Sequence, residues 1–274
     1  GSRNVLPKHG FPTDVVDLHT SHIELSQARQ VELQRDLRMA IAEFAPGNQV
    51  VAAKYLWRAG GVRLLPGRSL QTFRYAICPE CGRFHRAIAA PGGRSDAFPS
   101  NCTVCGANLA GREGRHGYYV WPEFGFVAQR EPPPSRVGQE RPPRLYASRV
   151  YFSEYTQEVE NPWLTWGDPA LDRMWLSYRH SRLGKLSLVN SGIANAGFRL
   201  CQTCGWAEPV PVDRRLDSRK HTNPRSGQPC TGMISAYHLG HEFTTDVLEL
   251  RFGGALTQGA GDASWLSTLY ALIE

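Results

Sequence analysis

The segment Cys78-Pro79-Glu80-Cys81-Gly82 decides the fold of this chain, because its pattern Cys-x-x-Cys-Gly occurs three times. The other copies are Cys102-Thr103-Val104-Cys105-Gly106 and Cys201-Gln202-Thr203-Cys204-Gly205. In such a turn two thiolates face one metal ion, and the glycine supplies the left-handed backbone that lets nearby amides point at sulfur. The three copies use all but one of the 7 cysteines, and we interpret them as zinc knuckles.

The cysteines divide into two predicted zinc sites. The first two knuckles are spaced as in a zinc ribbon and form a four-thiolate site from Cys78, Cys81, Cys102 and Cys105. The third knuckle lacks two ligands, and we predict a second site of Cys201, Cys204, His221 and Cys230. His238 and His241 follow within reach of Cys230 and are alternatives for the histidine ligand. We expect two zinc ions, both structural, because a closed four-ligand site leaves no position for water.

Composition and cysteine usage limit the class of protein. The alternatives are that the cysteines form disulfide bonds or are simply buried small side chains. Their odd number, the Cys-x-x-Cys pairs and the lack of a secretory signal indicate a reducing compartment. No apolar run approaches the roughly 20 residues needed to cross a membrane. We therefore expect a soluble, cytoplasmic protein with no membrane partner. The formal charge of +6 and pI near 9.0 allow a polyanionic partner.

Periodicity predicts few helices and many strands. Apolar residues at helical spacing predict one helix over 26–44, stopped by Ala45-Pro46-Gly47, and a second over 262–274 that begins at an Asp262 cap. Strands are predicted around 50–51, 73–77, 145–152, 174–180, 185–189, 197–201 and 245–252.

The domain organisation follows from the knuckles and from a segment rich in proline and arginine. Residues 129–144 cannot build a packed core, so they are the predicted linker. The predicted domains are a helical connector at 1–69, a zinc ribbon at 70–128, the linker, and a zinc-binding domain at 145–274 whose natural form continues further. The fold class is α+β, with a zinc ribbon followed by a mainly antiparallel β domain that holds the second zinc site and few helices.

No catalytic motif is evident in the sequence. Gly184-Lys185-Leu186-Ser187 lacks the upstream glycine and the hydroxyl position of a P-loop, and we interpret it as a turn. His241-Glu242-Phe243-Thr244-Thr245 lacks the second histidine of a zinc-peptidase helix. We expect this chain to be non-catalytic.

Two groups of residues carry a resemblance to a known family. The segment 239–248, preceded by the second ligand set and followed by 265–272, resembles the MrfA-like zinc-binding domain of bacterial DEAD/DEAH-box helicases and of DISARM DrmB-type antiphage proteins. Segments 6–16 and 35–47 are similar to the connector between motor and zinc domain in long members. The family type has four cysteines where this sequence has three and a histidine. The resemblance implies an ATP-dependent helicase as parent protein, with the motor in cis or in a partner subunit, and a role in DNA repair or antiphage defence.

Basic residues near the second zinc site make DNA a candidate partner. The predicted DNA-binding residues flank His221 and comprise Arg214, Arg215, Arg219, Lys220 and Arg225. A loop fixed at both ends by metal ligands loses less entropy on meeting phosphates. We therefore predict weak, sequence-independent binding to single-stranded or forked DNA. The alternative is a protein-interaction scaffold in an antiphage complex, without DNA contact.

Overall fold

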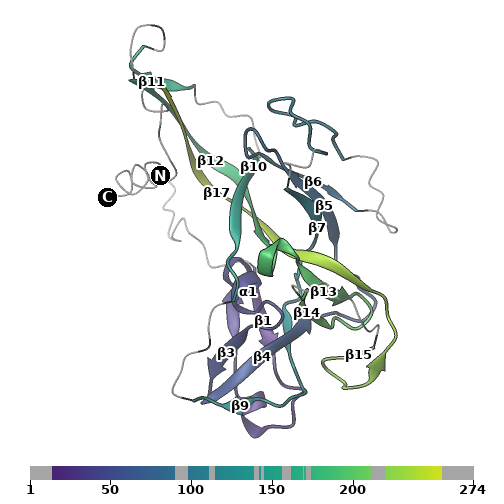
Figure 1. Ribbon diagram of the computed structural model, residues 1–274. Coiled ribbons are helices and arrows are strands. Elements are labelled where there is room, and N and C mark those ends of the chain that lie inside the picture. Colours follow the sequence, from purple (N-terminus) through teal and green to yellow (C-terminus); the bar gives the residue numbers. More distant parts are fainter. Residues whose placement is uncertain are drawn as a thin grey trace, which may run out of the picture. The chain divides into compact units, whose positions relative to one another are not determined.

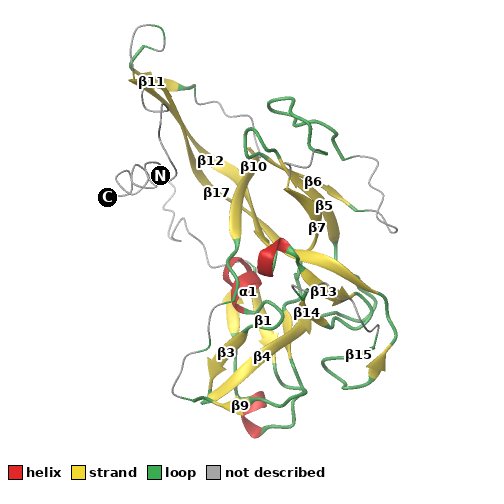
Figure 2. Cartoon of the chain, in the orientation of Figure 1, coloured by secondary structure: helices red, strands yellow, loops and turns green. Residues whose placement is uncertain are grey.

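The computed structural model describes residues 14–89, 98–110, 115–138, 142, 145–155, 162–168, 170, 174–211 and 220–254. Figure 2 shows that strands dominate this part of the chain and that helices are short. The chain forms two compact units: unit 1 comprises Gly1–Phe152 and Ser187–Glu242, and unit 2 comprises Ser153–Leu186 and Phe243–Glu274. Among the described residues, no helix has the length and apolar character to cross a membrane.

The predicted α+β class with a separate zinc ribbon was wrong. Strands account for 50% of the structure and helices for 7%. The first knuckle follows β5 (Thr72–Ile77), which pairs with β7 (Arg115–Val120). In turn β7 pairs in parallel with β17 (Ile234–Gly254), through His238 opposite Tyr119 and Leu239 opposite Val120. The predicted ribbon is therefore part of a sheet that also contains the last described strand.

The first sheet belongs wholly to unit 1. Its order is β2-β1-β8-β4-β3, and β9 pairs with the end of β4. Its members are β1 (Val15–His19), β2 (Gln34–Asp36), β3 (Gln49–Ala52), β4 (Tyr55–Val62), β8 (Phe126–Ala128) and β9 (Ser135–Arg136). Alternate residues such as Val16 and Leu18 are buried, as expected for strands with one face in a core.

The second sheet has the order β10-β12-β17-β7-β5-β6 (Figure 1), with β11, β13 and β14 attached beside this path. Its further members are β6 (Phe84–Ile88), β10 (Arg149–Tyr155), β11 (Leu164–Trp166), β12 (Met174–Asn190), β13 (Phe198–Cys201) and β14 (Ala207–Pro209). In unit 1, β13 runs antiparallel to β17 and β14. A small two-stranded sheet contains β15 (His221–Thr222) and β16 (Pro229–Cys230).

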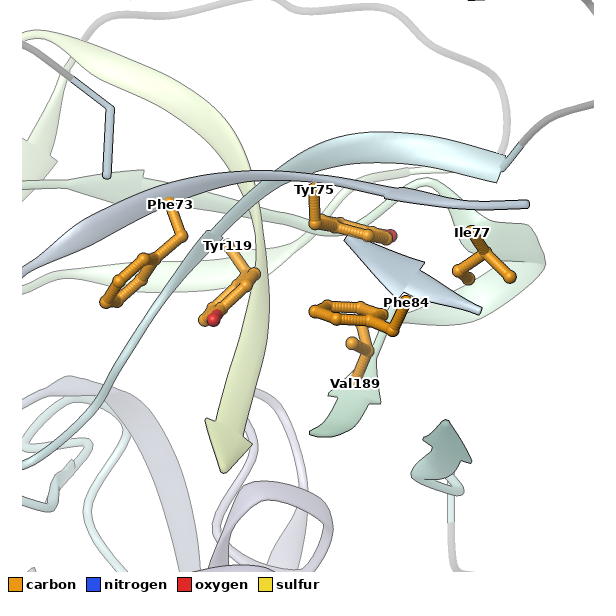
Figure 3. Packing of buried hydrophobic residues seen from close by; sticks show 6 residues of the cluster. All are labelled: Phe73, Tyr75, Ile77, Phe84, Tyr119 and Val189. Carbon is orange, nitrogen blue, oxygen red and sulfur yellow. The ribbon is translucent and has the colours of Figure 1, made fainter. Parts of the chain in front are cut away.

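The alternation of side chains along β5 explains how one strand serves both a core and a metal site. Phe73, Tyr75 and Ile77 face one side and pack with Phe84, Tyr119 and Val189 in the cluster drawn in Figure 3. Ala76 and Cys78 point to the other side and pack with Cys102 and Leu109. The period of 2 in a strand therefore directs the first metal ligand away from the aromatic cluster.

The predicted helix over 26–44 was wrong in extent. The segment contains the 3-10 helix η1 (Ser26–Arg29), the strand β2, and the short helix α1 (Leu37–Glu43). Helix α1 begins after Asp36, whose carboxylate accepts a hydrogen bond of 2.8 Å from the Arg38 amide. Pairing of β2 with β1 therefore prevails over the helical periodicity of this segment, and Asp36 marks the boundary as an N-cap.

Most predicted strands are confirmed, but one turn is not. The strands expected near 50–51, 73–77, 197–201 and 245–252 correspond to β3, β5, β13 and part of β17, and the one expected at 145–152 is confirmed only from Arg149, where β10 begins. The turn predicted at Gly184-Lys185 was wrong, because β12 runs unbroken from Met174 to Asn190. In the sheet, β12 lies between β10 and β17.

The compact units have different limits from the predicted domains. The predicted linker, residues 129–144, includes β9, which pairs with β4 through Arg136 opposite Tyr55. The predicted C-terminal helix over 262–274 lies outside the described residues. Strands β12 and β17 contribute to both units, with 187–190 and 234–242 in unit 1. A second 3-10 turn, η2 (Ile193–Asn195), follows β12.

Unit 2 contains an antiparallel pairing of β11 with β12, in which Leu164 lies opposite Tyr178. On this unit Arg179 lies over the rings of Tyr155 and Trp163, each at 4.7 Å from the centroid, and donates to Glu249 at 2.8 Å. These contacts hold the pair of long strands together through charge and aromatic packing.

Candidate metal centres

The first cysteine set converges as predicted. The ligand atoms of Cys78, Cys81, Cys102 and Cys105 all lie within 4.8 Å of one another. The Sγ atoms of Cys78 and Cys105 are 3.4 Å apart, and those of Cys81 and Cys102 are 3.6 Å apart. A tetrahedral Zn²⁺ with Zn–S bonds of about 2.3 Å places its sulfurs about 3.8 Å apart. The set therefore fits a four-thiolate zinc site.

All three knuckles share one backbone pattern. In each, the glycine amide donates to the carbonyl of the first cysteine, and the glycine has a positive φ. The pairs are Gly82 to Cys78 at 3.0 Å, Gly106 to Cys102 at 2.9 Å and Gly205 to Cys201 at 2.9 Å, with φ of 68°, 78° and 81°. The three motifs therefore share the turn geometry expected of knuckles, in which glycine is favoured because a side chain at these φ values is disfavoured.

The surroundings of the first set favour a thiolate at Cys102. Burial opposes ionisation there, but the amides of Cys105 and Val104 and the ring of His85 lower the pKa of Cys102 to about 6. The Nε2 atom of His85 lies 3.3 Å from the Cys102 Sγ, and His85 is buried. His85 was not predicted from the sequence as a partner of the first cysteine set. The signal that could have identified it is its position three residues after the knuckle glycine Gly82. An outer-shell partner of this kind orients a ligand and tunes its basicity.

The second set also converges. Cys201, Cys204, His221 and Cys230 present ligand atoms within 4.8 Å of one another, and the Sγ atoms of Cys201 and Cys230 are 3.9 Å apart. The short sheet places His221 opposite Cys230, which brings the last two ligands to the knuckle. The amide of Gly232 donates to the Cys230 Sγ at 3.3 Å, and the Trp206 ring lies 5.1 Å from that of His221. Three sulfurs and one imidazole suit tetrahedral zinc.

Geometry favours His221 over the two alternative histidines as the fourth ligand. His221 lies in the second cluster, whereas the two alternatives lie on β17 with other partners. The Nδ1 of His238 is 2.6 Å from the Tyr75 hydroxyl. His241 is buried, and its Nε2 lies 3.7 Å from the Asp14 carboxylate. Burial lowers the pKa of both histidines.

The second site is built against the first sheet. The amide of Val62, in β4, donates to the Gly205 carbonyl at 2.8 Å, and Gly61 bridges to Trp206. A Cβ on Gly205 would lie 2.1 Å from the Val62 carbonyl oxygen. The third knuckle therefore requires glycine for its φ and for the close approach of another backbone.

The predicted DNA-binding residues are only partly described. Arg214, Arg215 and Arg219 lie outside the described residues, whereas Lys220 and Arg225 are exposed. Arg225 lies in a turn in which the side-chain oxygen of Asn223 accepts a hydrogen bond of 2.9 Å from the Arg225 backbone amide. Sequence reasoning placed Arg225 in the loop between ligands, and the pairing of His221 with Cys230 confirms that position.

The chemistry of both centres is that of closed sites. Each set already contains four ligands, so a bound zinc ion would have no open position for a substrate. Within the described ranges, these two sets are the groups of three or more potential ligands close enough to share an ion. The metal would therefore act on the fold, through the loops that it joins.

Comparisons with known proteins give one informative match. The chain is similar to the Druantia protein DruE of Escherichia coli (strain UMEA 4076-1), with 24% identity over 301 residues. The match covers 98% of this chain and 15% of DruE, so the chain spans a small part of this relative. No protein-family profile and no solved structure matches the chain. The resemblance to the MrfA-like domain is not confirmed and stays a prediction.

Proposed function

We propose that this chain is a non-catalytic zinc-binding module of an antiphage defence protein of the DruE kind. The observation that carries the proposal is a similarity to DruE over nearly the whole chain, which includes both converged ligand sets. The two closed sites support a structural use of zinc. A helicase motor, in the same polypeptide or in a partner subunit, is the proposed neighbour, and this rests on the resemblance to helicase-associated domains.

The defence role predicts a loss of protection when the metal sites are removed. We expect cells that carry the natural full-length protein with its companion genes to resist phage, and cells with Cys201→Ser and Cys204→Ser to lose that resistance. The reason is that the altered knuckle can no longer hold the fold that the rest of the protein uses. Efficiency of plating measures the effect, with protein abundance followed by immunoblot. Full protection by the variant, at equal abundance and with the second zinc absent, would refute a role of this module in defence.

A group of basic residues supports DNA contact by unit 1. The pKa of His22 is lowered to about 4, first by burial and then by the charges of His19, Arg225 and Arg130. The pKa of His19 is also lowered, by burial and by the charges of Arg63 and Arg225. These cations therefore lie close enough to act on the same imidazoles.

The metal-bound hairpin contributes one side of this basic group. A Cβ on Gly227, between the ligands His221 and Cys230, would lie 3.7 Å from the Arg130 Cδ atom. Arg130 forms an ion pair of 2.5 Å with Glu24, whereas the buried Nε of Arg63 has no hydrogen-bond partner within the described residues. Cations gathered in this way suit the phosphates of a nucleic-acid backbone, because binding there releases counterions.

The DNA proposal predicts a change in salt dependence. Replacing Arg63 and Arg225 with glutamine should weaken binding of single-stranded DNA of every sequence alike. It should also reduce the slope of log affinity against log salt by about 1 to 2, since each lost phosphate contact removes about 0.7 from a single-strand slope. Fluorescence anisotropy over a salt series measures both quantities.

A matched pair of arginines provides the control. Arg68→Gln with Arg182→Gln removes the same charge from exposed positions outside the basic group, and should leave the slope near that of the natural sequence. If the Arg63 and Arg225 changes alter neither the DNA affinity nor the salt slope while both zinc ions stay bound, the result would favour the alternative of a protein-interaction scaffold.

A further inference from the structure

A cavity of about 180 Å³ opens in unit 1, away from both metal sets. Its apolar walls are Ile77 and Val189, which Figure 3 shows at one end of the aromatic cluster. The hydroxyl oxygen of Tyr75 points toward this end of the cluster (Figure 3). The polar groups around the cavity come from three strands and from the segment between β12 and β13, and comprise Arg115, His116, Tyr151, Ser191, Asn195 and His238.

Two of the residues that line this cavity, Tyr75 and His238, form a hydrogen-bonded pair. The Tyr75 hydroxyl is 2.6 Å from the Nδ1 of His238, and the His238 ring also bonds the backbone carbonyl of Asn195. Burial raises the pKa of Tyr75 and lowers that of His238, so both groups are neutral near pH 7. Because a neutral imidazole donates from one nitrogen only, Tyr75 donates to Nδ1 and the ring donates to Asn195.

The loop that carries Asn195 is held in an unusual conformation. Ala194 and Asn195 have φ of 50° and 59°, in the left-handed region that residues with a Cβ seldom adopt. Such a conformation persists where its surroundings enforce it, and it is common at ligand sites. Here the His238 ring holds the Asn195 carbonyl, and the Ser191 hydroxyl donates to the Asn195 side-chain oxygen at 2.9 Å. Among the described residues no acceptor bonds the Asn195 side-chain nitrogen, which can therefore donate to a ligand.

The cavity is rich in donors and positively charged. Within the described residues the Arg115 side chain forms no ion pair or hydrogen bond, and none of the residues that line the cavity is a carboxylate. The Tyr151 hydroxyl likewise has no hydrogen-bond partner among the described residues. A guanidinium, an amide and a hydroxyl that approach from separate strands suit an anion with several acceptor oxygens.

We propose that this cavity binds a phosphate group, either as free phosphate or as the terminal phosphate of a nucleic acid. Arg115 supplies the charge, and Tyr151 and Asn195 donate to separate phosphate oxygens. The size of the cavity admits one such group and excludes a duplex. The site shares no residue with the basic group of Arg63, Arg130 and Arg225, so it stands apart from the proposed DNA contact.

Calorimetric titration of the zinc-loaded chain tests this site. The probes are inorganic phosphate, a 5′-phosphorylated thymidine trinucleotide and the same trinucleotide with a 5′-hydroxyl, at constant ionic strength. We expect phosphate to bind, and Arg115→Gln to weaken that binding roughly tenfold or more, because it removes a charge-assisted hydrogen bond. Tyr151→Phe should weaken it by roughly twofold to tenfold, as expected for one neutral hydrogen bond. Arg182→Gln, a control in unit 2, should have no effect.

The trinucleotides distinguish the two sources of phosphate. Tighter binding of the 5′-phosphorylated form than of the 5′-hydroxyl form, abolished by Arg115→Gln, identifies a nucleic-acid end. Equal binding of the two trinucleotides, with Arg115-dependent binding of inorganic phosphate, identifies free phosphate. Failure of every phosphate probe to bind, or binding that Arg115→Gln leaves unchanged, overturns the proposal. Because Arg63 and Arg225 are intact throughout, that failure would not bear on the DNA surface.

Discussion

Replacing Cys201 and Cys204 together with serine should leave one zinc ion per chain and abolish the cooperative unfolding of unit 1. Structural zinc in small domains binds with about 10 to 16 kcal/mol, which is comparable to or larger than the net stability of about 5 to 15 kcal/mol of a typical domain. Cys201 is buried at the end of β13, and its knuckle is hydrogen-bonded to β4 of the other sheet. Native mass spectrometry counts the ions, and circular dichroism during heating follows the transition.

The corresponding change at the first site is the control. Cys81→Ser with Cys105→Ser should also leave one zinc ion, but with a smaller loss of stability, because both cysteines are exposed at the ends of their turns. A chelator should also remove the zinc of this exposed site before it removes the zinc of the second site. Two ions retained after either change, or a cooperative transition at the same temperature in both variants, would contradict the assignment of separate sites with unequal roles.

Gly205→Ala should destabilise the zinc-loaded protein by roughly 2 to 5 kcal/mol. A left-handed conformation costs about 1 to 2 kcal/mol for a residue with a Cβ, and overpacking adds about 1 to 3 kcal/mol. At this position the new Cβ would lie 2.1 Å from the Val62 carbonyl oxygen, so the hydrogen bond between the Val62 amide and the Gly205 carbonyl would have to move. Urea denaturation measures the change.

The other knuckles supply controls at the same position of the same motif. Gly82 and Gly106 have similar φ, but a Cβ on either meets no atom within 4 Å. Alanine at these positions should therefore cost only the conformational term of about 1 to 2 kcal/mol. Gly61→Ala approaches the same contact from β4, where its Cβ would lie 2.1 Å from the Gly205 oxygen. A loss at Gly205 no larger than that at Gly82 would show that the contact with β4 does not stabilise the fold.

The metal ligands could be predicted from sequence because their signal is local. Two cysteines three positions apart with a following glycine specify a turn by themselves, and the three turns have the same hydrogen bonds. The histidine ligand needed more than spacing, since His221, His238 and His241 all followed the third knuckle. Its identity depends on the pairing of His221 with Cys230 and on the place of the other two in β17.

The architecture could not be predicted because its decisive contacts join distant segments. No local pattern shows that β7 pairs in parallel with β17, which merges the expected ribbon with the last described strand. Pairing of β2 with β1 likewise shortened the expected helix to α1. In β12, Gly184 is a turn signal that neighbouring strands override. The basic group around His19 could not be predicted for the same reason, since Arg63, Arg130 and Arg225 are distant in the sequence and come together only in the fold.

The parallel pairing of β7 with β17 also affects how the protein is made on the ribosome. The backbone pairing of Tyr119 and Val120 with His238 and Leu239 cannot form until these later residues have been synthesised. At about 5 to 20 residues per second, the edge of β7 stays open for on the order of ten seconds after it emerges. During that interval the four cysteines of the first set are already available, whereas Cys230 is not. Nascent chains should therefore acquire their two metal ions in order, and the open strand edge is a site where a chaperone would protect them from pairing with one another.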